Sequence, residues 1–215
     1  MPTTAAQTAD YRTVVRERHS VRHYDPTVKI SESELKEMLE EATLAPSSSN
    51  TQTWRFLIIT DDEAKKRLHP IANNQQQVLE ASATIVVLGD LEGYKEMPRI
   101  FGDAVRAGYM PEDFAKQYAE RSLPLYASMP PERMSNLVHF DGGLVSMQFM
   151  LTAKSRGYDT VPMGGFNHEK LVEEFAIPSN LVPLLLIAVG KAATPGRLTT
   201  RLPIDDITFW NKIEK

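Results

Sequence analysis

The sequence predicts a layered fold of the α/β or α+β class, in which helices cover a sheet. Three short apolar segments rich in β-branched residues, at 54–60, 84–90 and 182–190, are bounded by turn residues, which indicates buried strands. Segments with helical periodicity separate these strands along the chain. At 215 residues the chain can bury one sizeable core, and no repeat or linker divides it, so we expect one domain over 1–215.

The N-terminal third contains the clearest predicted helix. The opening ten residues are polar and lack the basic and apolar regions of a secretory signal, so we expect a polar lead-in. The helix at 31–43 begins with a capping box of Ser31 and Glu34, and apolar residues then recur at helical spacing. Residues 62–80, between the first two strands, are expected to form a mostly polar helix.

The longest predicted helix, at about 134–156, is apolar on nearly all sides. Such a helix is expected to be buried or shared with another subunit. It contains the pair Gly142-Gly143, which costs about 1 kcal/mol per glycine relative to alanine in a helix. We therefore expect a close backbone approach at this pair.

Residues 91–133 differ from the rest of the chain. They contain prolines at 98, 111, 124, 130 and 131 and show weak apolar periodicity. We expect an excursion from the core rather than a core layer. Two interpretations stay open for it: a solvated insertion, or a mobile lid over a ligand site.

Composition and charge exclude several classes of function. A formal net charge of -4 gives no electrostatic reason to expect nucleic acid or an acidic membrane as partner, and no segment resembles a membrane span. The chain has no cysteine, which excludes disulfides, thiolate catalysis and cysteine-ligated metal centres. We expect a cytoplasmic protein.

The common catalytic motifs are missing as well. The sequence has no glycine-rich dinucleotide or phosphate loop, no zinc-peptidase motif and no serine-hydrolase elbow. Its five histidines show no metal-site spacing, so no metal is expected. What remains is a set of polar clusters spread along the chain.

Two of these clusters suit the binding of a small ligand. "RERHSVRHYD" at 16–25 concentrates arginine, histidine and serine, which suits a phosphate monoester, although a basic turn is also an ordinary solvated surface. Arg197 and Arg201 would complete an anion clamp if the fold brings them to this cluster. "LAPSSSNTQTWRF" at 44–56 places short hydroxyl and amide side chains between a helix and a strand, and taken alone indicates only a polar turn.

With these clusters in place, the chain resembles the nitroreductase family of FMN-dependent NAD(P)H oxidoreductases over roughly residues 12–205. The resemblance rests on five collinear stretches, namely "RHSVRHYD" at 18–25, "LAPSSSNTQTWRF" at 44–56, "NQQQVLEAS" at 74–82, "DGGLVSMQFMLTAKSRGYDTVPMGGFN" at 141–167 and "RLP" at 201–203. It implies an α+β fold with helices flanking a central mixed sheet. It also implies an intertwined homodimer that binds FMN at the subunit interface, with a C-terminal tail from about 195 that wraps the neighbouring subunit.

The resemblance further implies which residues contact FMN. One subunit would hold the phosphate, the ribityl chain and the pyrimidine end of the ring with Arg18, His19, Ser20, Arg22, Asn74, Gln77 and Arg201. The partner subunit would line the isoalloxazine and ribityl groups with Pro46, Ser47, Ser48 and Asn50, with Gln52 nearby. In "PMGGF", formed by Pro162, Met163, Gly164, Gly165 and Phe166, the backbone N–H groups of the two glycines would lie beside flavin N5 and O4. Taken alone, this motif also fits an ordinary glycine turn after a strand.

The implied reaction passes hydride from NADH or NADPH to FMN and then to a nitroaromatic, quinone or similar acceptor by a ping-pong mechanism, with no side chain named as catalytic. Many relatives carry lysine at the position of Gln77 and another basic residue at the position of Thr199, and some carry glutamate at the position of Gly164. These departures leave the reduction potential open. Another flavin reaction, such as dehalogenation, desaturation or flavin breakdown, or a non-enzymatic flavin-binding role, stays as an alternative.

Overall fold

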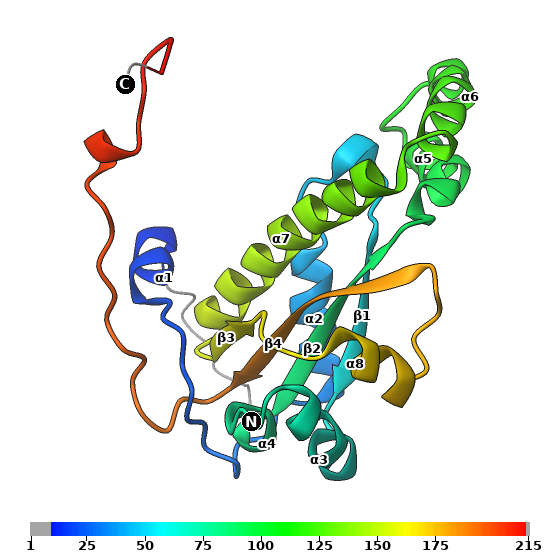
Figure 1. The fold of residues 1–215 in the computed structure, drawn as a ribbon. Coiled ribbons are helices and arrows are strands. Elements are labelled where there is room, and N and C mark those ends of the chain that lie inside the picture. Colours follow the sequence, from blue (N-terminus) through cyan, green and yellow to red (C-terminus); the bar gives the residue numbers. More distant parts are fainter. Residues whose placement is uncertain (1–9, 214–215) are drawn as a thin grey trace, which may run out of the picture.

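The centre of the protein is a four-stranded sheet with the order β1-β2-β4-β3 (Figure 1). The computed structural model describes residues 10–213, so nearly all of the predicted N-terminal lead-in lies outside the described residues. The strands are β1 (Trp54–Ile59), β2 (Ala83–Asp90), β3 (Asp159–Met163) and β4 (Leu181–Gly190). All three strand pairings are antiparallel, and a parallel bridge joins Ser20 to Thr160 at the edge of β3. The predicted class of helices on a sheet is confirmed.

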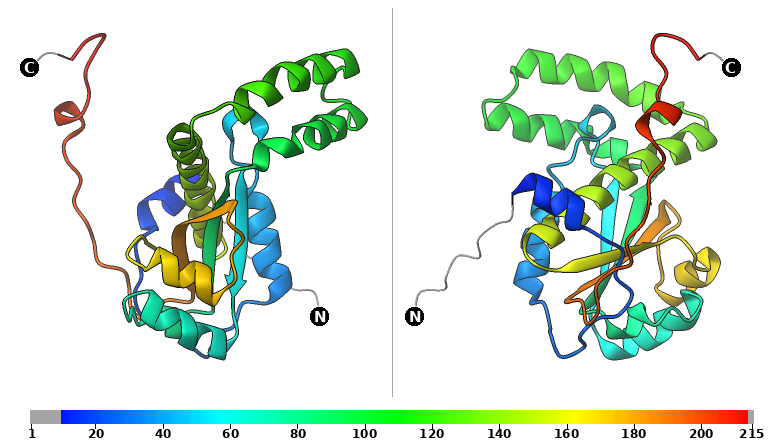
Figure 2. Two further views of the ribbon diagram at one scale, coloured as in Figure 1. Left: turned by 45° about the vertical axis from the view of Figure 1, so that its right-hand side comes forward. Right: turned by 90° about the vertical axis from the view of Figure 1, so that its left-hand side faces the viewer.

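Helices cover both faces of this sheet (Figure 2). The helices are α1 (Tyr11–Glu17), α2 (Glu32–Ala42), α3 (Asp62–Ile71), α4 (Gln77–Glu80), α5 (Met97–Arg106), α6 (Glu112–Ala127), α7 (Pro131–Ser155) and α8 (His168–Glu174), with short 3-10 turns η1 (Ser48–Asn50), η2 (Gly93–Glu96) and η3 (Ile204–Asp206). On one face, α2 and α7 pack on Ile85 and Val87 of β2. On the other, α3, α4 and α8 pack on Val86 and Leu88, as the two-residue period of a strand requires. None of the described helices is long and apolar enough to cross a membrane.

The predicted cap of α2 is present in part. The Ser31 hydroxyl accepts a hydrogen bond from the Glu34 N–H at 3.2 Å, as a capping residue does. The Glu34 carboxylate, however, accepts a hydrogen bond from the Tyr158 hydroxyl at 3.0 Å. Glu34 therefore connects α2 to the segment before β3.

The prediction of one helix over 62–80 is wrong. Helix α3 ends at Ile71, and the chain turns before α4 begins at Gln77. In the turn, Asn73 and Asn74 have left-handed backbone conformations, with φ of 56° and 54°. Asparagine adopts this conformation more readily than most residues, and it ends a right-handed helix.

Residues 91–133 are more regular than their sequence suggests. They form η2, α5 and α6, and α5 and α6 project from the sheet as a helical hairpin (Figure 1). Met97, Phe101, Ala115 and Ala119 form a small apolar cluster of their own inside this hairpin.

Helix α7 has one buried and one open side. A Cβ on Gly142 would overlap the side chain of Leu184 of β4, so this glycine makes room for a side chain of its own chain rather than for a second backbone. The neighbouring Gly143 faces open space, with no atom within 4 Å of where its Cβ would lie. Phe140 and Met147, on the same open side, are 65% and 39% exposed.

The chain from Lys191 to Thr199 lies close to the segment of residues 18–25, and beyond it the chain to Ile213 extends away from the rest of the molecule (Figures 1 and 2). Apolar side chains along it are exposed, including Leu198, Leu202, Ile204, Ile207, Phe209, Trp210 and Ile213. Trp210 alone is 84% exposed. The tail therefore presents apolar surface that its own chain does not cover.

Candidate functional site

The residues predicted to bind FMN fall into two groups at opposite edges of the sheet, one around the edge strand β3 and one before the edge strand β1. Ser20 forms a β-bridge with Thr160 of β3. Thr160 pairs with Val189 of β4, and Val189 in turn pairs with Ala83 at the start of β2. The loop of residues 46–52 leads into Trp54, which pairs with Gly89 near the end of β2. The part of β2 from Ala83 to Gly89 spans roughly 20 Å, at about 3.4 Å per residue. We call the first group, residues 18–22, 74–77 and 162–165, the β3 group, and the second the 46–52 loop.

The basic end of the β3 group is held by backbone hydrogen bonds. The Val21 N–H donates to the Thr160 carbonyl at 3.1 Å, and the Ala193 N–H donates to the His23 carbonyl at 2.9 Å. Tyr24 anchors the segment: its hydroxyl donates to the Ala188 carbonyl, and burial raises the pKa of this phenol well above its usual range. The segment of residues 18–25 thus lies between β3 and the start of the C-terminal tail.

A cavity of about 470 Å³ lies where these two segments meet. Ser20 and Arg22 line it from one side, and Arg197 and Thr199 line it from the tail. The structure therefore brings the two basic clusters together through Arg22 and Arg197. Of the other predicted phosphate contacts, Arg18, His19 and Arg201 do not line this cavity, and the Arg201 guanidinium donates to the Thr199 hydroxyl and the Thr200 carbonyl at 2.7 and 2.8 Å.

Gly196 is the reason that the tail can lie so close to the basic segment. A Cβ on this residue would lie 2.6 Å from the Cβ of His19 and 3.2 Å from the Ser20 carbonyl oxygen. Any larger residue would push the tail away and open the cavity. Gly196 is not among the residues predicted from the sequence, because its close neighbour His19 lies far away in the chain.

The second part of the β3 group is the glycine turn after β3. The Gly165 carbonyl accepts hydrogen bonds from the Asn73 and Gln75 side-chain amides, both at 3.0 Å. A Cβ on Gly164 would meet nothing within 4 Å, so one side of the turn is open to a ligand. Asn73 and Gln75 are not among the residues predicted from the sequence, although both belong to the amide-rich run at 73–77 that contains Asn74 and Gln77.

Gln77 contacts Gln75 and Met163 next to this turn. Its side chain is buried, and its amide nitrogen donates to the Gln75 side-chain oxygen at 3.0 Å and approaches the Met163 sulfur at 3.3 Å. These contacts join the predicted residues Gln77 and Met163. Asn74 stands beside them in the left-handed turn, and Pro162 is half-buried within the edge strand β3, where its missing N–H is tolerated.

The 46–52 loop is fixed largely by its own short side chains. The Ser47 hydroxyl accepts from the Gln52 N–H at 3.0 Å, and the Asn50 side-chain oxygen accepts from the Gln52 amide at 3.3 Å. Outside the loop, the Asp141 carboxylate of α7 accepts from both the N–H and the hydroxyl of Ser48, at 3.0 and 2.9 Å. Part of the serine-rich stretch thus forms the hydrogen bonds that hold the loop, while Pro46 and Asn50 are exposed.

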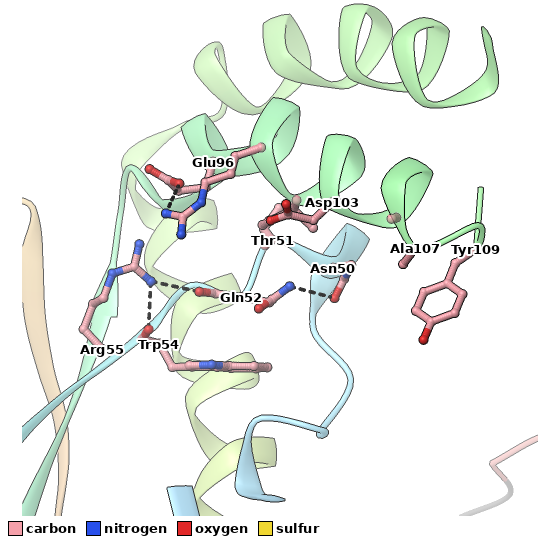
Figure 3. A pocket seen from close by; sticks show the side chains of 12 residues that line it. Asn50, Thr51, Gln52, Trp54, Arg55, Glu96, Asp103, Ala107 and Tyr109 are labelled. Atoms are coloured by element: carbon pink, nitrogen blue, oxygen red, sulfur yellow. Dashed lines mark hydrogen bonds and ion pairs between the residues drawn. The ribbon is translucent and has the colours of Figure 1, made fainter. Parts of the chain in front are cut away.

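A larger cavity of about 700 Å³ lies beside this loop (Figure 3). Asn50, Gln52 and Trp54 line one wall, and residues of η2, α5 and the turn after it line the other. Arg55 also lines the cavity. Its guanidinium donates to the Gln52 and Trp54 carbonyls and pairs with Asp90 at 2.8 Å. The hairpin of residues 91–133 therefore forms one side of a cavity.

Metal ligands do not gather in the part of the chain from 10 to 213: no three histidine, cysteine or acidic side chains lie where they could hold an ion together. The donors of both groups are guanidinium, hydroxyl, amide and backbone N–H groups. This donor set suits an organic anion with many hydrogen-bonding edges.

Comparison with known proteins identifies relatives over nearly the whole chain. The model of the Nitroreductase family matches residues 15–191. The chain is 43% identical over 206 residues, 95% of this chain and 99% of the relative, to a Bacillus subtilis protein provisionally named NAD(P)H nitroreductase YdgI. It is 34% identical to the CLA biosynthesis enone reductase of Lactiplantibacillus plantarum, over 89% of this chain and 90% of that protein. A solved nitroreductase from Exiguobacterium sibiricum in complex with FMN superimposes with a TM-score of 0.92, at 42% identity, over 96% of this chain and all of that one.

Proposed function

Because the chain belongs to the nitroreductase family, we propose that it holds FMN between two copies of itself and reduces a small organic acceptor. As a member of that family it is an NAD(P)H-dependent oxidoreductase. The observation that carries the proposal is that the β3 group and the 46–52 loop lie at opposite edges of the sheet, with Ser20 and Trp54 also separated along most of the length of β2. Two copies can bring these groups to one flavin. A cytoplasmic location, where NADH and NADPH are available, is part of the proposal.

The basic end of the β3 group fits the phosphate of FMN. Arg22, Arg197 and Ser20 meet at one cavity, and guanidinium groups with a hydroxyl form charge-assisted hydrogen bonds to phosphate oxygens. We propose that Arg18 and Arg201 turn toward the phosphate when it binds, with His19 beside them. Arg201 is exposed, which leaves its guanidinium room to move.

The glycine turn fits the ring of the flavin. One side of Gly164 is open, and Asn73 and Gln75 fix the carbonyl of Gly165, so the turn is held in place without covering its exposed side. We propose that the N–H groups of the two glycines face the ring and that Asn74 and Gln77 face its pyrimidine end. When bound, FMN supplies the hydride-transfer chemistry, and the protein residues bind and orient it.

The second copy supplies the other half of the site. Ser47, Ser48 and Asn50 of the partner subunit, with the partner's Pro46 and Gln52, are proposed to line the flavin on the side that the β3 group leaves open. The open side of α7 and the C-terminal tail support this dimer, because both carry apolar side chains that their own chain leaves exposed. A two-fold dimer buries the same surface on both copies.

The acceptor is proposed to bind in the cavity of about 700 Å³ next to the 46–52 loop, with the hairpin of residues 91–133 as its lid. Trp54, Ile100 and Tyr109 give this cavity apolar and aromatic surface, which suits a flat nitroaromatic or quinone. An enone is a second candidate, supported by the name of the relative that is 34% identical to this chain.

A kinetic experiment tests the proposal. Purified protein is expected to be yellow, and NADH or NADPH should bleach its flavin absorbance before any acceptor is added. We propose that NADH or NADPH and the acceptor occupy the same face of the flavin in turn, so double-reciprocal plots at several acceptor concentrations should be parallel for nitroarenes, quinones or enones. Intersecting lines would show that both substrates bind together, which would contradict the shared site. A colourless protein that binds no added FMN would contradict the proposal as a whole.

A further inference from the structure

We propose that Asp141 is a positioning residue, whose buried carboxylate holds the 46–52 loop in the shape that meets the flavin of the other copy. This inference rests on the proposed function, since it takes the loop to be half of a composite flavin site. Asp141 is not among the residues predicted from the sequence. It lies on α7, and Ser48, its main partner, is 93 residues away in the chain.

The first observation is the environment of the carboxylate. Asp141 is fully buried, and its oxygens accept hydrogen bonds from the Ser48 N–H, the Ser48 hydroxyl and, at 3.2 Å, the Thr53 hydroxyl. In the described part of the chain, no lysine, arginine or histidine forms an ion pair with it. A buried charge without a counter-ion is costly, and it is tolerated only when its hydrogen bonds are satisfied. Two of these three bonds go to the loop.

The second observation is the conformation of the loop. Ser49, Asn50 and Gln52 have left-handed backbone conformations, with φ of 50°, 54° and 47°. Such conformations are unfavourable for residues other than glycine, and they persist when surrounding contacts determine them. Asp141 binds Ser48 immediately before the first left-handed residue.

Most other hydrogen bonds of the loop cannot fix its position, because both partners belong to the loop. This holds for the bonds that join Ser47 and Asn50 to Gln52. Among the described side chains, two hydrogen-bond residues 47–50 to another element: Asp141, and Tyr118 of α6, whose hydroxyl lies 3.3 Å from the Ser49 hydroxyl. The Asp141 contacts are shorter and more numerous, and the Asp141 side chain itself is buried.

The place of Asp141 on α7 extends this role. Its neighbours Phe140 and Gly143 lie on the open side of α7, which we propose to be the dimer contact. The same helix therefore meets the other copy on one side and fixes the loop on the other. Dimer packing and loop position are connected through a single rigid element.

The test compares two variants of Asp141 with a matched control in the holoenzyme. Asp141→Ala removes the acceptor and should speed FMN dissociation at least tenfold and raise the acceptor KM. Asp141→Asn should restore FMN retention to within about threefold of wild type, because the amide oxygen accepts both Ser48 bonds and the amide nitrogen donates to the Thr53 hydroxyl. Thr53→Val is the control: it removes a bond to the same carboxylate without touching the loop, so the unfolding midpoint should fall while FMN dissociation stays within about twofold.

Two readouts separate this role from plain stabilisation. If Asp141 only stabilised the fold, Asp141→Ala and Thr53→Val would both lower the unfolding midpoint and leave FMN dissociation unchanged, which would overturn the proposal. Should Asp141→Ala fail to fold, Asp141→Leu carries the test, since it removes the carboxylate acceptor while filling the same space and leaves every residue proposed to line the flavin in place. FMN dissociation at the wild-type rate in that variant would then refute the role of Asp141. A wild-type protein without FMN would refute the proposed function itself.

Discussion

Replacing Gly143 with phenylalanine tests whether the open side of α7 is the contact between two copies. In a single chain the change has little to disturb, because no atom lies within 4 Å of where a Cβ would stand. The expected effect on folding of one chain is within about 0.5 kcal/mol, as for an exposed position away from special features. The proposed dimer predicts a different outcome, because a large ring would overpack the contact.

The size of that effect follows from symmetry. Overpacking costs about 1–3 kcal/mol at one site, and a two-fold contact contains the substitution on both copies, so the dimer should lose roughly 2–6 kcal/mol. At 1.4 kcal/mol per factor of ten, dimer affinity should fall by a factor of about 30 or more. Since the flavin site is composite, FMN should leave together with the partner.

Light scattering after size exclusion, with flavin absorbance measured in line, checks both quantities at once. Gly142→Ala is the comparison, because its new methyl group meets Leu184 inside the chain. That variant should lower the unfolding midpoint without a selective loss of the dimer. A Gly143→Phe protein that stays dimeric and fully loaded with FMN would refute the placement of the contact on this side of α7.

Three further changes test the β3 group. Arg22→Ala should weaken FMN binding by about 2–3 kcal/mol, roughly 30- to 150-fold in a fluorescence titration, because it leaves phosphate charge uncompensated; unchanged affinity would remove Arg22 from the phosphate site. Gln77→Lys should raise the midpoint potential of bound FMN by about 20–60 mV, equivalent to 1–3 kcal/mol over two electrons, because a cation favours the more negative reduced flavin. A dye-coupled titration showing an equal or lower potential would contradict this placement. Replacing Asn73 and Gln75 together by alanine should slow flavin reduction about tenfold in stopped-flow measurements, because Gly165 loses the donors that fix its carbonyl; wild-type rates would show that this turn needs no such support.

Local sequence patterns predicted the elements that local physics determines. The strands at 54–60, 84–90 and 182–190 are present because each is an apolar run rich in β-branched residues between turn residues, and the helix at 134–156 is present as a long apolar segment. The prediction of one helix over 62–80 was wrong for an equally local reason. Two asparagines form a left-handed turn there, and the spacing of apolar residues does not reveal such a turn. The hairpin of residues 91–133 gave a weak signal because α5 and α6 bury only a small cluster against each other.

The candidate site was predicted in its residue types but not in its supports. Arg22, the glycine turn and the serine-rich loop could be named because each belongs to a continuous stretch that carries the resemblance to the family. Asp141 and Gly196 could not, because each matters through one contact with a residue 93 or more positions away. Such contacts depend on the packing of the whole chain, which no short stretch of sequence contains.

Because of the distance between the β3 group and the 46–52 loop, two defective variants should complement each other in a mixed dimer. If every active site takes one half from each chain, a variant defective in the β3 group, such as Arg22→Ala, and one defective in the loop, such as Asn50→Ala, complement each other. In a mixed dimer one site receives both defects and the other receives none. After equal amounts are unfolded and refolded together, random pairing makes half of the dimers mixed, so about one quarter of all sites should regain FMN and activity. Two colourless proteins would then yield a yellow mixture.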